Sequence, residues 1–222
     1  MLHDVIEIGE EVGARKTFLW VIDWPGWCRS GKDGPLAIDA LIDHGPRYAH
    51  VAAEAGTEAP TDASAHDLST VESVSGNGGT DFGVPSIITE RDARPVDAAM
   101  AARFAAIVGA AWTLLDRLAT TAPPELRKGP RGGGRDRDKV IAHVIGADHA
   151  YAREIGLRLP EPTFDDRAAV EAERAAILEV IGRPSDGSPL ADRRWTQRYA
   201  ARRIAWHALD HVWEIEDRSE PA

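Results

Sequence analysis

The spacing of apolar residues along the chain changes near residue 95, and this change of period constrains the fold more than any other feature. Before it, short segments alternate between apolar and polar residues or are rich in β-branched and aromatic residues, as strands are. After it, residues 97–119 carry apolar side chains at every third or fourth position, the spacing of one face of a long helix. We therefore expect an α+β N-terminal unit followed by an all-α unit.

Four amphipathic helices are predicted after the change of period. They are expected at about 97–119, 136–156, 165–181 and 199–217. Paired prolines close the first helix, and loops rich in Gly, Pro and Asp separate the others. Helices joined in this way suit a four-helix bundle. We assign the bundle to residues 95–222.

Three short strands, a helix and a fourth strand are predicted before residue 95. The strands are expected at 4–10, 16–23, 27–30 and 68–74, with the helix running from Pro35 to about Val51. Proline suits the first turn of a helix, whereas Gly45-Pro46 should interrupt or bend it. This order describes a small α+β domain at 1–79 with its helix on one face of the sheet. Residues 80–94 are expected to form a connector.

Two histidines, His207 and His211, lie four residues apart in the last predicted helix. Residues at this spacing lie one above the other, so both imidazoles can reach a single ion. At about 100° per residue they share a face with the apolar Ile204 and Ile215. Two histidines satisfied by hydrogen bonds at an interface are the alternative. A third ligand decides between the two interpretations.

The second predicted helix offers that third ligand. His143 shares a face with apolar residues and is expected to point inward, whereas His149 falls about 120° away and is expected to face solvent. His143, His207 and His211 would supply three nitrogen ligands and leave positions open for water or substrate, as catalytic sites do. Three neutral imidazoles suit Zn²⁺, Ni²⁺, Fe²⁺ or Mn²⁺. We therefore expect a divalent metal site.

Two acidic residues of the last helix are candidates for a supporting role. Glu214 lies on the same side as His207, two turns further on, and is the candidate for a catalytic base or for orienting a ligand. Asp210 is placed similarly. For both residues, a solvated salt bridge is the alternative.

The stretches around these histidines resemble a known family. Residues 138–146 (DKVIAHVIG) and 204–214 (IAWHALDHVWE) resemble the DinB-like superfamily of metal-binding four-helix proteins, which includes mycothiol-dependent maleylpyruvate isomerase. The resemblance covers about residues 92–220, and the ligand pattern of the family falls on His143, His207 and His211. It implies a thiol-dependent S-transferase or isomerase in some members, with a low-molecular-weight thiol as cofactor.

The N-terminal segment resembles HicB-like domains through Phe18, Pro25-Gly26, Ser30-Gly31 and the Ala-rich helix that follows. In toxin–antitoxin systems such domains occur beside a DNA-binding module, and we recognise no such module in this sequence. We interpret the unit as structural or as a wall of the metal site. Binding of RNA or of a toxin is the alternative, which the acidic charge disfavours.

Several arginines are candidates to hold a carboxylate of the substrate or cofactor. The candidates are Arg131, Arg135, Arg202 and Arg203, and we assign the role to Arg135 and Arg203. Solvated surface arginines are the alternative for each. The glycine-rich loop at 128–135 lacks the spacing of a phosphate-binding P-loop. It is expected to be a surface loop, with a lid as the alternative.

The net charge and the cysteine content of the chain disfavour several classes of partner and of structure. The net charge of −10 disfavours binding to nucleic acid and to anionic membranes. We identify no apolar run of about 20 residues and no signal peptide, so a cytoplasmic protein is expected. The single cysteine, Cys28, excludes an internal disulfide framework. It is expected to be a buried structural thiol rather than a nucleophile.

Two hypotheses of function follow. The first is a metal-dependent enzyme for a small-molecule substrate, a thiol S-transferase or isomerase in which the three histidines hold the metal that activates a thiol or water. The second is a non-catalytic metal-binding or partner-binding protein with the bundle as scaffold. A second apolar stripe of the last helix, Trp206, Leu209 and Trp213, is expected to meet the N-terminal unit or another subunit. A homodimer is therefore a further expectation.

Overall fold

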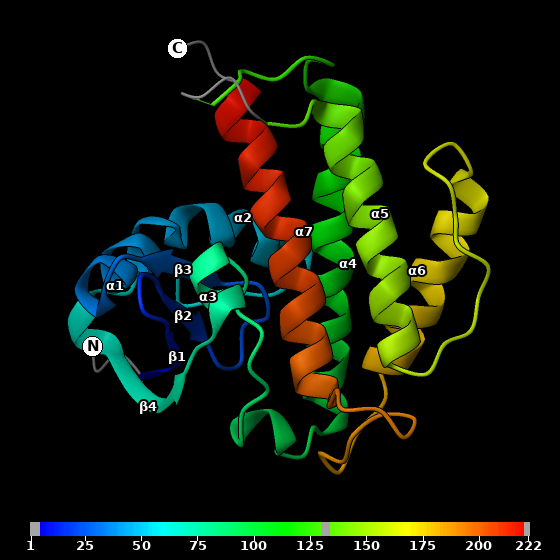
Figure 1. The fold of residues 1–222 in the computed structure, drawn as a ribbon. Coiled ribbons are helices and arrows are strands. Elements are labelled where there is room, and N and C mark those ends of the chain that lie inside the picture. Colours follow the sequence, from blue (N-terminus) through cyan, green and yellow to red (C-terminus); the bar gives the residue numbers. More distant parts are fainter. Residues whose placement is uncertain (1–4, 130–133, 220–222) are drawn as a thin grey trace.

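The computed structural model describes residues 5–129 and 134–219 of the chain (Figure 1). Its first half contains β1 (Ile6–Val12), β2 (Thr17–Val21), β3 (Cys28–Gly31), α1 (Gly34–Asp43), α2 (Gly45–Glu54), β4 (Leu68–Ser75) and α3 (Gly78–Phe82). Its second half contains α4 (Ala98–Thr121), α5 (Arg137–Glu154), α6 (Arg167–Ile181) and α7 (Gln197–Ser219). The predicted order, an α+β unit followed by a helical half, is confirmed.

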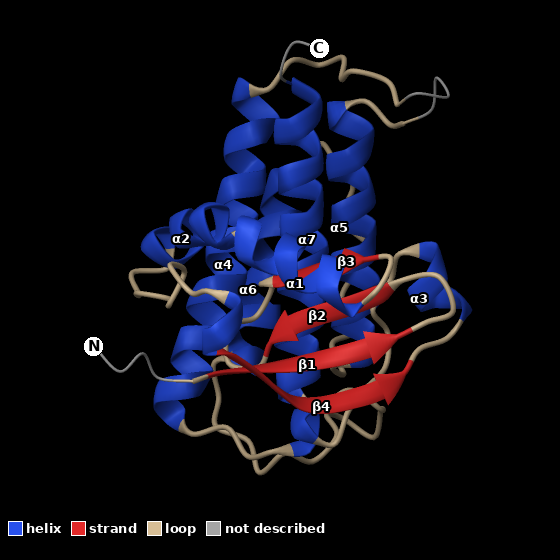
Figure 2. Ribbon diagram, turned by 90° about the vertical axis from the view of Figure 1, so that its left-hand side faces the viewer, coloured by secondary structure: helices blue, strands red, loops and turns tan. Residues whose placement is uncertain are grey.

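The N-terminal strands form a mixed sheet of order β3-β2-β1-β4 in the described part of the chain (Figure 2). β1 pairs antiparallel with β2 and parallel with β4, and β2 pairs antiparallel with β3. All four strands lie within a few residues of their predicted positions. Position 4, at the start of the first predicted strand, is outside the described residues.

The helix predicted after the third strand is interrupted at the expected place. Asp33 caps α1 by accepting a hydrogen bond from the backbone N–H of Leu36, and Pro35 occupies its first turn. α1 ends at Asp43, and α2 begins at Gly45 with Pro46 in its first turn. Proline lacks the N–H that would continue the earlier helix, so the chain forms two helices instead of one bent helix.

β2 is buried on both faces of the sheet, and this joins the two halves of the protein. Leu19 and Val21 belong to the large core that includes residues of α1 and of the helical half. Phe18 and Trp20 point to the other face, where they pack with Cys28 and with Trp206 of α7. The rings of Phe18 and Trp206 meet edge to face with centroids 6.2 Å apart. The second apolar stripe of α7 therefore meets the N-terminal unit, and it gives no support to a homodimer.

Gly26 allows the turn between β2 and β3 to approach α7 closely. Its φ of 87° lies in the left-handed region, which side chains disfavour. A β-carbon added there would lie 2.6 Å from Cδ1 of Leu209. Gly26 is thus explained by the close approach of this turn to the last helix.

The helical half consists of α4, α5, α6 and α7, which contact one another and lie beside the sheet (Figure 1). One hydrophobic cluster contains residues of the sheet, of α1 and α2 and of all four long helices. The predicted boundary between residues 79 and 80 falls inside α3, and a short 3-10 helix, Arg91–Ala93, lies in the predicted connector. One hydrophobic core therefore spans both halves, and the division into domains stays a prediction.

One expectation about membrane segments needs correction. α4 is long and apolar enough to cross a membrane by length and composition, although we expected no such run. Its apolar residues, among them Phe104, Ile107 and Leu115, lie in the core between the other helices. Of the apolar window in this helix, 44% is buried inside the protein, and the cytoplasmic location stays a prediction.

A buried ion pair ties α7 to the chain that precedes the helical half. The guanidinium of Arg202 donates to the Asp92 carboxylate at 2.6 Å, and each side chain is 7% exposed. The same guanidinium donates to the carbonyl of Ile87 and lies 4.4 Å from the ring centroid of Trp20. Arg202 is thus engaged in the fold, and the suggestion that it holds a substrate carboxylate is not supported.

We predict that Asp92→Ala destabilises the protein by about 3–5 kcal/mol, because it leaves the Arg202 guanidinium buried without its counter-ion. Asp217→Ala removes one exposed partner of Arg47 and should cost at most about 1 kcal/mol. Urea unfolding followed by circular dichroism measures both values. Equal losses in the two variants would contradict the assigned role of the buried pair.

Candidate metal centre

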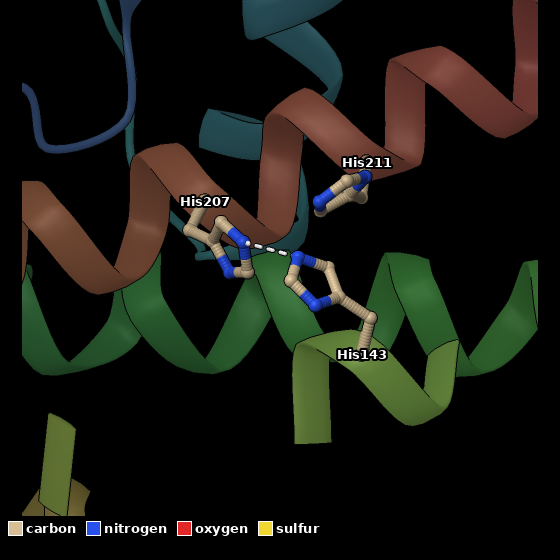
Figure 3. Close-up of side chains that lie close together, drawn as sticks. All are labelled: His143, His207 and His211. Atoms are coloured by element: carbon tan, nitrogen blue, oxygen red, sulfur yellow. Dashed lines mark hydrogen bonds between the residues drawn. The ribbon is translucent and has the colours of Figure 1, made fainter. Parts of the chain in front are cut away.

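Three histidines from two helices converge in the structure (Figure 3). His143 comes from α5, whereas His207 and His211 come from successive turns of α7. Each offers one ligand nitrogen, and these atoms lie within 4.8 Å of one another. The prediction that His143 joins the His207–His211 pair is confirmed, and the three lie close enough together to bind a metal ion.

The spacing of two of these nitrogens fits coordination of a shared ion. Nε2 of His143 and Nε2 of His207 are 3.3 Å apart. Two nitrogens bound to one tetrahedral ion at about 2.0–2.1 Å lie about 3.3–3.4 Å apart. A hydrogen bond between the two rings is the alternative explanation, and it would require a proton on one of the facing nitrogens.

Glu214 holds the third histidine in position. Its Oε2 lies 2.7 Å from Nδ1 of His211, so the carboxylate accepts from an Nδ1–H and leaves the Nε2 lone pair for a metal. Its Oε1 accepts from Nη1 of Arg218 at 2.5 Å. Hydrogen bonds to His211 and Arg218 lower the pKa of Glu214, although partial burial opposes this effect. Of the two suggested roles, this geometry matches orientation of a ligand.

Arg218 connects this group to the loop before α5. Its Nε donates to the carbonyl of Arg127 at 2.8 Å, and its Nη2 donates to the carbonyl of Arg135 at 2.7 Å. The backbone N–H of Arg127 in turn donates to the carbonyl of Arg218. Both sides of the glycine-rich loop are therefore anchored at the end of α7.

Burial keeps two of the histidines neutral. The pKa of His207 falls to about 2, chiefly because burial disfavours its charged form, and the neighbouring His211 and His143 lower it further. The pKa of His143 is lowered by burial first and then by the charges of His211 and Arg135. Nδ1 of His207 is buried and has no hydrogen-bond partner among the described residues. Neutral imidazole is the form that binds metal ions.

An aromatic and cationic wall lies beside His207, and sequence reasoning recognised only part of it. The ring of Tyr151 lies 5.7 Å from that of His207, measured between centroids. The guanidinium of Arg203 lies 5.5 Å from the Tyr151 ring and 4.8 Å from the Trp206 ring, and it donates to the carbonyl of Pro85 at 3.0 Å. Arg203 is thus brought to the site, as predicted. Tyr151 was missed as a site residue, although it lies two turns after His143 on the same face of the helix.

The other arginines differ in how the structure places them. Arg135 is exposed just before α5, and its charge lowers the pKa of both His143 and His207, so it lies near the histidines. Arg131 is outside the described residues, as is the part of the predicted loop at 130–133. The structure therefore brings Arg135 and Arg203, the two assigned arginines, to the same region as the histidines.

Two further candidates have structural roles. Cys28 is buried, and burial raises the pKa of its thiol to about 12, so it stays protonated and unreactive, as expected for a structural thiol. Asp210 forms an ion pair with Arg29 at 3.0 Å. The salt-bridge interpretation of Asp210 is confirmed.

The expectation that His149 faces solvent is wrong. It is 9% exposed, and its Nδ1 lies 2.7 Å from Oε1 of the buried Glu173 on α6. α5 packs against α7 on one side and against α6 on another, so more than one of its faces is buried. His149 is not part of the three-histidine cluster, as predicted, because it points toward a different neighbour.

The chain matches no family model, no curated protein and no solved structure in the comparisons made with known proteins. The resemblances to DinB-like and HicB-like proteins therefore stay predictions.

We predict that the chain purified without an affinity tag binds about one divalent ion, and that Glu214→Gln weakens this binding by about 10–100-fold because His211 loses its orienting carboxylate. His211→Ala removes a ligand and should weaken it more. Metal titration with detection by mass spectrometry measures both, with the exposed His66→Ala as control. Equal metal affinity in the parent and His211→Ala would exclude this site.

We also predict that acid destabilises the metal-free protein partly through His207. Its pKa is about 2 in the folded chain and near 6.5 when unfolded, so below pH 6.5 the unfolded state binds a proton that the folded state does not. The group then lowers the free energy of unfolding by up to about 1.4 kcal/mol per pH unit as pH falls. Unfolding curves between pH 7 and 5 should show a shallower pH dependence in His207→Gln. Parallel curves would contradict the lowered pKa.

Proposed function

We propose that the protein is a metal-dependent enzyme of the DinB-like type, in which His143, His207 and His211 hold a divalent ion and a thiol-dependent S-transfer or isomerisation takes place beside it. One observation carries the proposal: three inward imidazoles from α5 and α7 approach one another, and a carboxylate orients one of them. Ligand histidines with a carboxylate partner are typical of metal centres. The thiol-dependent part rests on the family resemblance.

The choice of a catalytic rather than a structural metal rests on the number of ligands. Among the described residues, the group that could hold an ion contains three histidines and no fourth ligand. Zinc in structural sites usually has four protein ligands, whereas catalytic sites have three and an open position. A bound divalent ion would supply Lewis-acid activation by lowering the pKa of a thiol or water.

The neighbouring cations suggest what the chain itself contributes to binding. Arg203 is fixed by the Pro85 carbonyl and by two aromatic rings, so its guanidinium has a defined position next to His207. Arg135 adds a second positive charge. Together they would bind a carboxylate of the thiol or of the substrate. Burial raises the pKa of Tyr151, and the adjacent Arg203 lowers it by a smaller amount. The pKa is therefore raised, and the phenol stays protonated as a hydrogen-bond donor.

Glu214 is proposed to be a positioning residue. Both of its oxygens are engaged, one by His211 and the other by Arg218. It would therefore act through the histidine and not on the substrate. The metal affinity of Glu214→Gln, described above, separates this role from that of a base.

The test uses protein loaded with Co²⁺, whose absorption reports its ligands. Mycothiol, bacillithiol and glutathione are added in turn, and a sulfur-to-metal charge-transfer band in the near ultraviolet is expected with one of them. That thiol is then assayed for conjugation to monobromobimane and for isomerisation of maleylpyruvate with each candidate metal. His211→Ala should lose both the band and the turnover.

We predict that Arg203→Gln raises the KM for the thiol or substrate at least tenfold, because a charge-assisted carboxylate contact is lost. The exposed Arg194→Gln serves as a charge-matched control and should leave KM unchanged. Steady-state kinetics with the metal-loaded protein measures both. A protein that binds metal but neither binds a thiol nor turns over a substrate would instead favour the non-catalytic binding protein.

A further inference from the structure

A pocket lies toward the C-terminal end of α5, away from His143. It has a volume of about 680 Å³, within the range of about 300–1,000 Å³ that small-molecule sites occupy. Its charged lining consists of Arg153, Arg158 and Arg193, and His149 also faces it. His143 and His149 are six residues apart, or about 9 Å along the helix axis. The pocket is thus separate from the metal centre and uses residues that the proposed function leaves aside.

The charge of the pocket is opposite to that of the chain. The protein carries a net charge of −10, yet three exposed arginines line this one pocket. None of the three forms an ion pair with a carboxylate in the described part of the chain, and no lining residue carries one. Unpaired like charges repel one another, so holding them around a cavity favours a negatively charged ligand. Arginine is well suited to this because its planar group binds phosphate and carboxylate through two hydrogen bonds.

His149 contributes a buried and oriented polar group to the same pocket. Glu173, which is 3% exposed, holds Nδ1 of His149 at 2.7 Å. Nε2 is therefore the ring nitrogen left to meet a ligand. It can accept a hydrogen bond from a protonated oxyanion or, after taking up a proton, donate one. A buried carboxylate–histidine pair at a pocket is an arrangement that fixes the direction of this bond.

Two loops that pack tightly give the pocket its shape. Gly156 follows α5 with a φ of 90°, and a β-carbon added there would lie 2.2 Å from the β-carbon of Ala191. Ala191 and Asp192 themselves have φ values of 48° and 55°, which residues other than glycine rarely adopt. The next residue is Arg193, whose backbone N–H donates to the carbonyl of Leu190. This tight turn therefore brings Arg193 into the lining of the same pocket as Arg153.

We propose that this pocket binds a small molecule through a multivalent oxyanion, either a phosphate group or a cluster of carboxylates. Arg153, Arg158 and Arg193 surround the anion, and His149 forms the directional hydrogen bond. Phosphate and carboxylate groups both present negatively charged oxygens, but they differ in the geometry and the charge of those oxygens. The site is independent of metal binding at the three histidines.

The test is calorimetric titration of the metal-free full chain with inorganic phosphate and, separately, with citrate at constant ionic strength. Saturable binding of at least one anion is expected. The double variant Arg153→Gln/Arg193→Gln should weaken it at least tenfold, whereas Arg194→Gln, an exposed neighbour that does not line the pocket, should change it less than twofold. Stronger binding of phosphate would identify a phosphorylated ligand, and stronger binding of citrate a polycarboxylate.

Two further measurements test whether the anion binds at this pocket. His211→Ala should bind the anion like the parent, because the two sites are separate. The ring ¹⁵N signals of His149 should shift during the titration in the parent, and the same shift should need at least tenfold more anion in the double arginine variant. No saturable binding of either anion, or equal weakening by Arg194→Gln and by the double variant, would overturn the proposal.

Discussion

The burial of α7 on both of its sides is the constraint on which the rest of the structure depends. One side packs Trp206 against Phe18, Trp20 and Cys28 of the sheet, while the opposite side enters the core between α4 and α5. The buried Arg202–Asp92 pair fixes the helix between these layers. Because breaking a buried pair is costly, α7 has little freedom to rotate or slide. The positions of His207 and His211 are therefore set by packing over the whole length of the helix.

This packing also explains how three histidines can remain close together. Charged imidazoles at this distance would repel one another, and burial adds a further penalty to the charged form. The pKa values of His207 and His143 are lowered accordingly, so these two imidazoles are neutral near neutral pH and can lie close to each other without charge repulsion. The same burial that disfavours protonation leaves neutral imidazole nitrogens within 4.8 Å of one another, close enough to bind a metal ion.

Local patterns predicted the strands, the break at Gly45-Pro46 and the four long helices, because each follows from periodicity and backbone chemistry within a short segment. They also placed His143 with the His207–His211 pair, since helical spacing decides which side chains point inward. The burial of His149 depends on where α6 packs, and the partner of Arg202 is 110 residues away. Such pairings depend on tertiary contacts, which periodicity along one helix does not contain.

The hydrogen bonds of Arg218 have a mechanical consequence for the histidine cluster. Arg218 binds the carbonyls of Arg127 and Arg135 with two of its nitrogens and the Glu214 carboxylate with the third. Glu214 in turn holds the His211 ring. The two ends of the loop are thereby linked to one imidazole through a continuous relay of side chains. Moving Arg127 and Arg135 away from the end of α7 would break the hydrogen bonds of Arg218 and loosen the restraint on the His211 ring, so the orientation of this ring is coupled to the chain on either side of the loop.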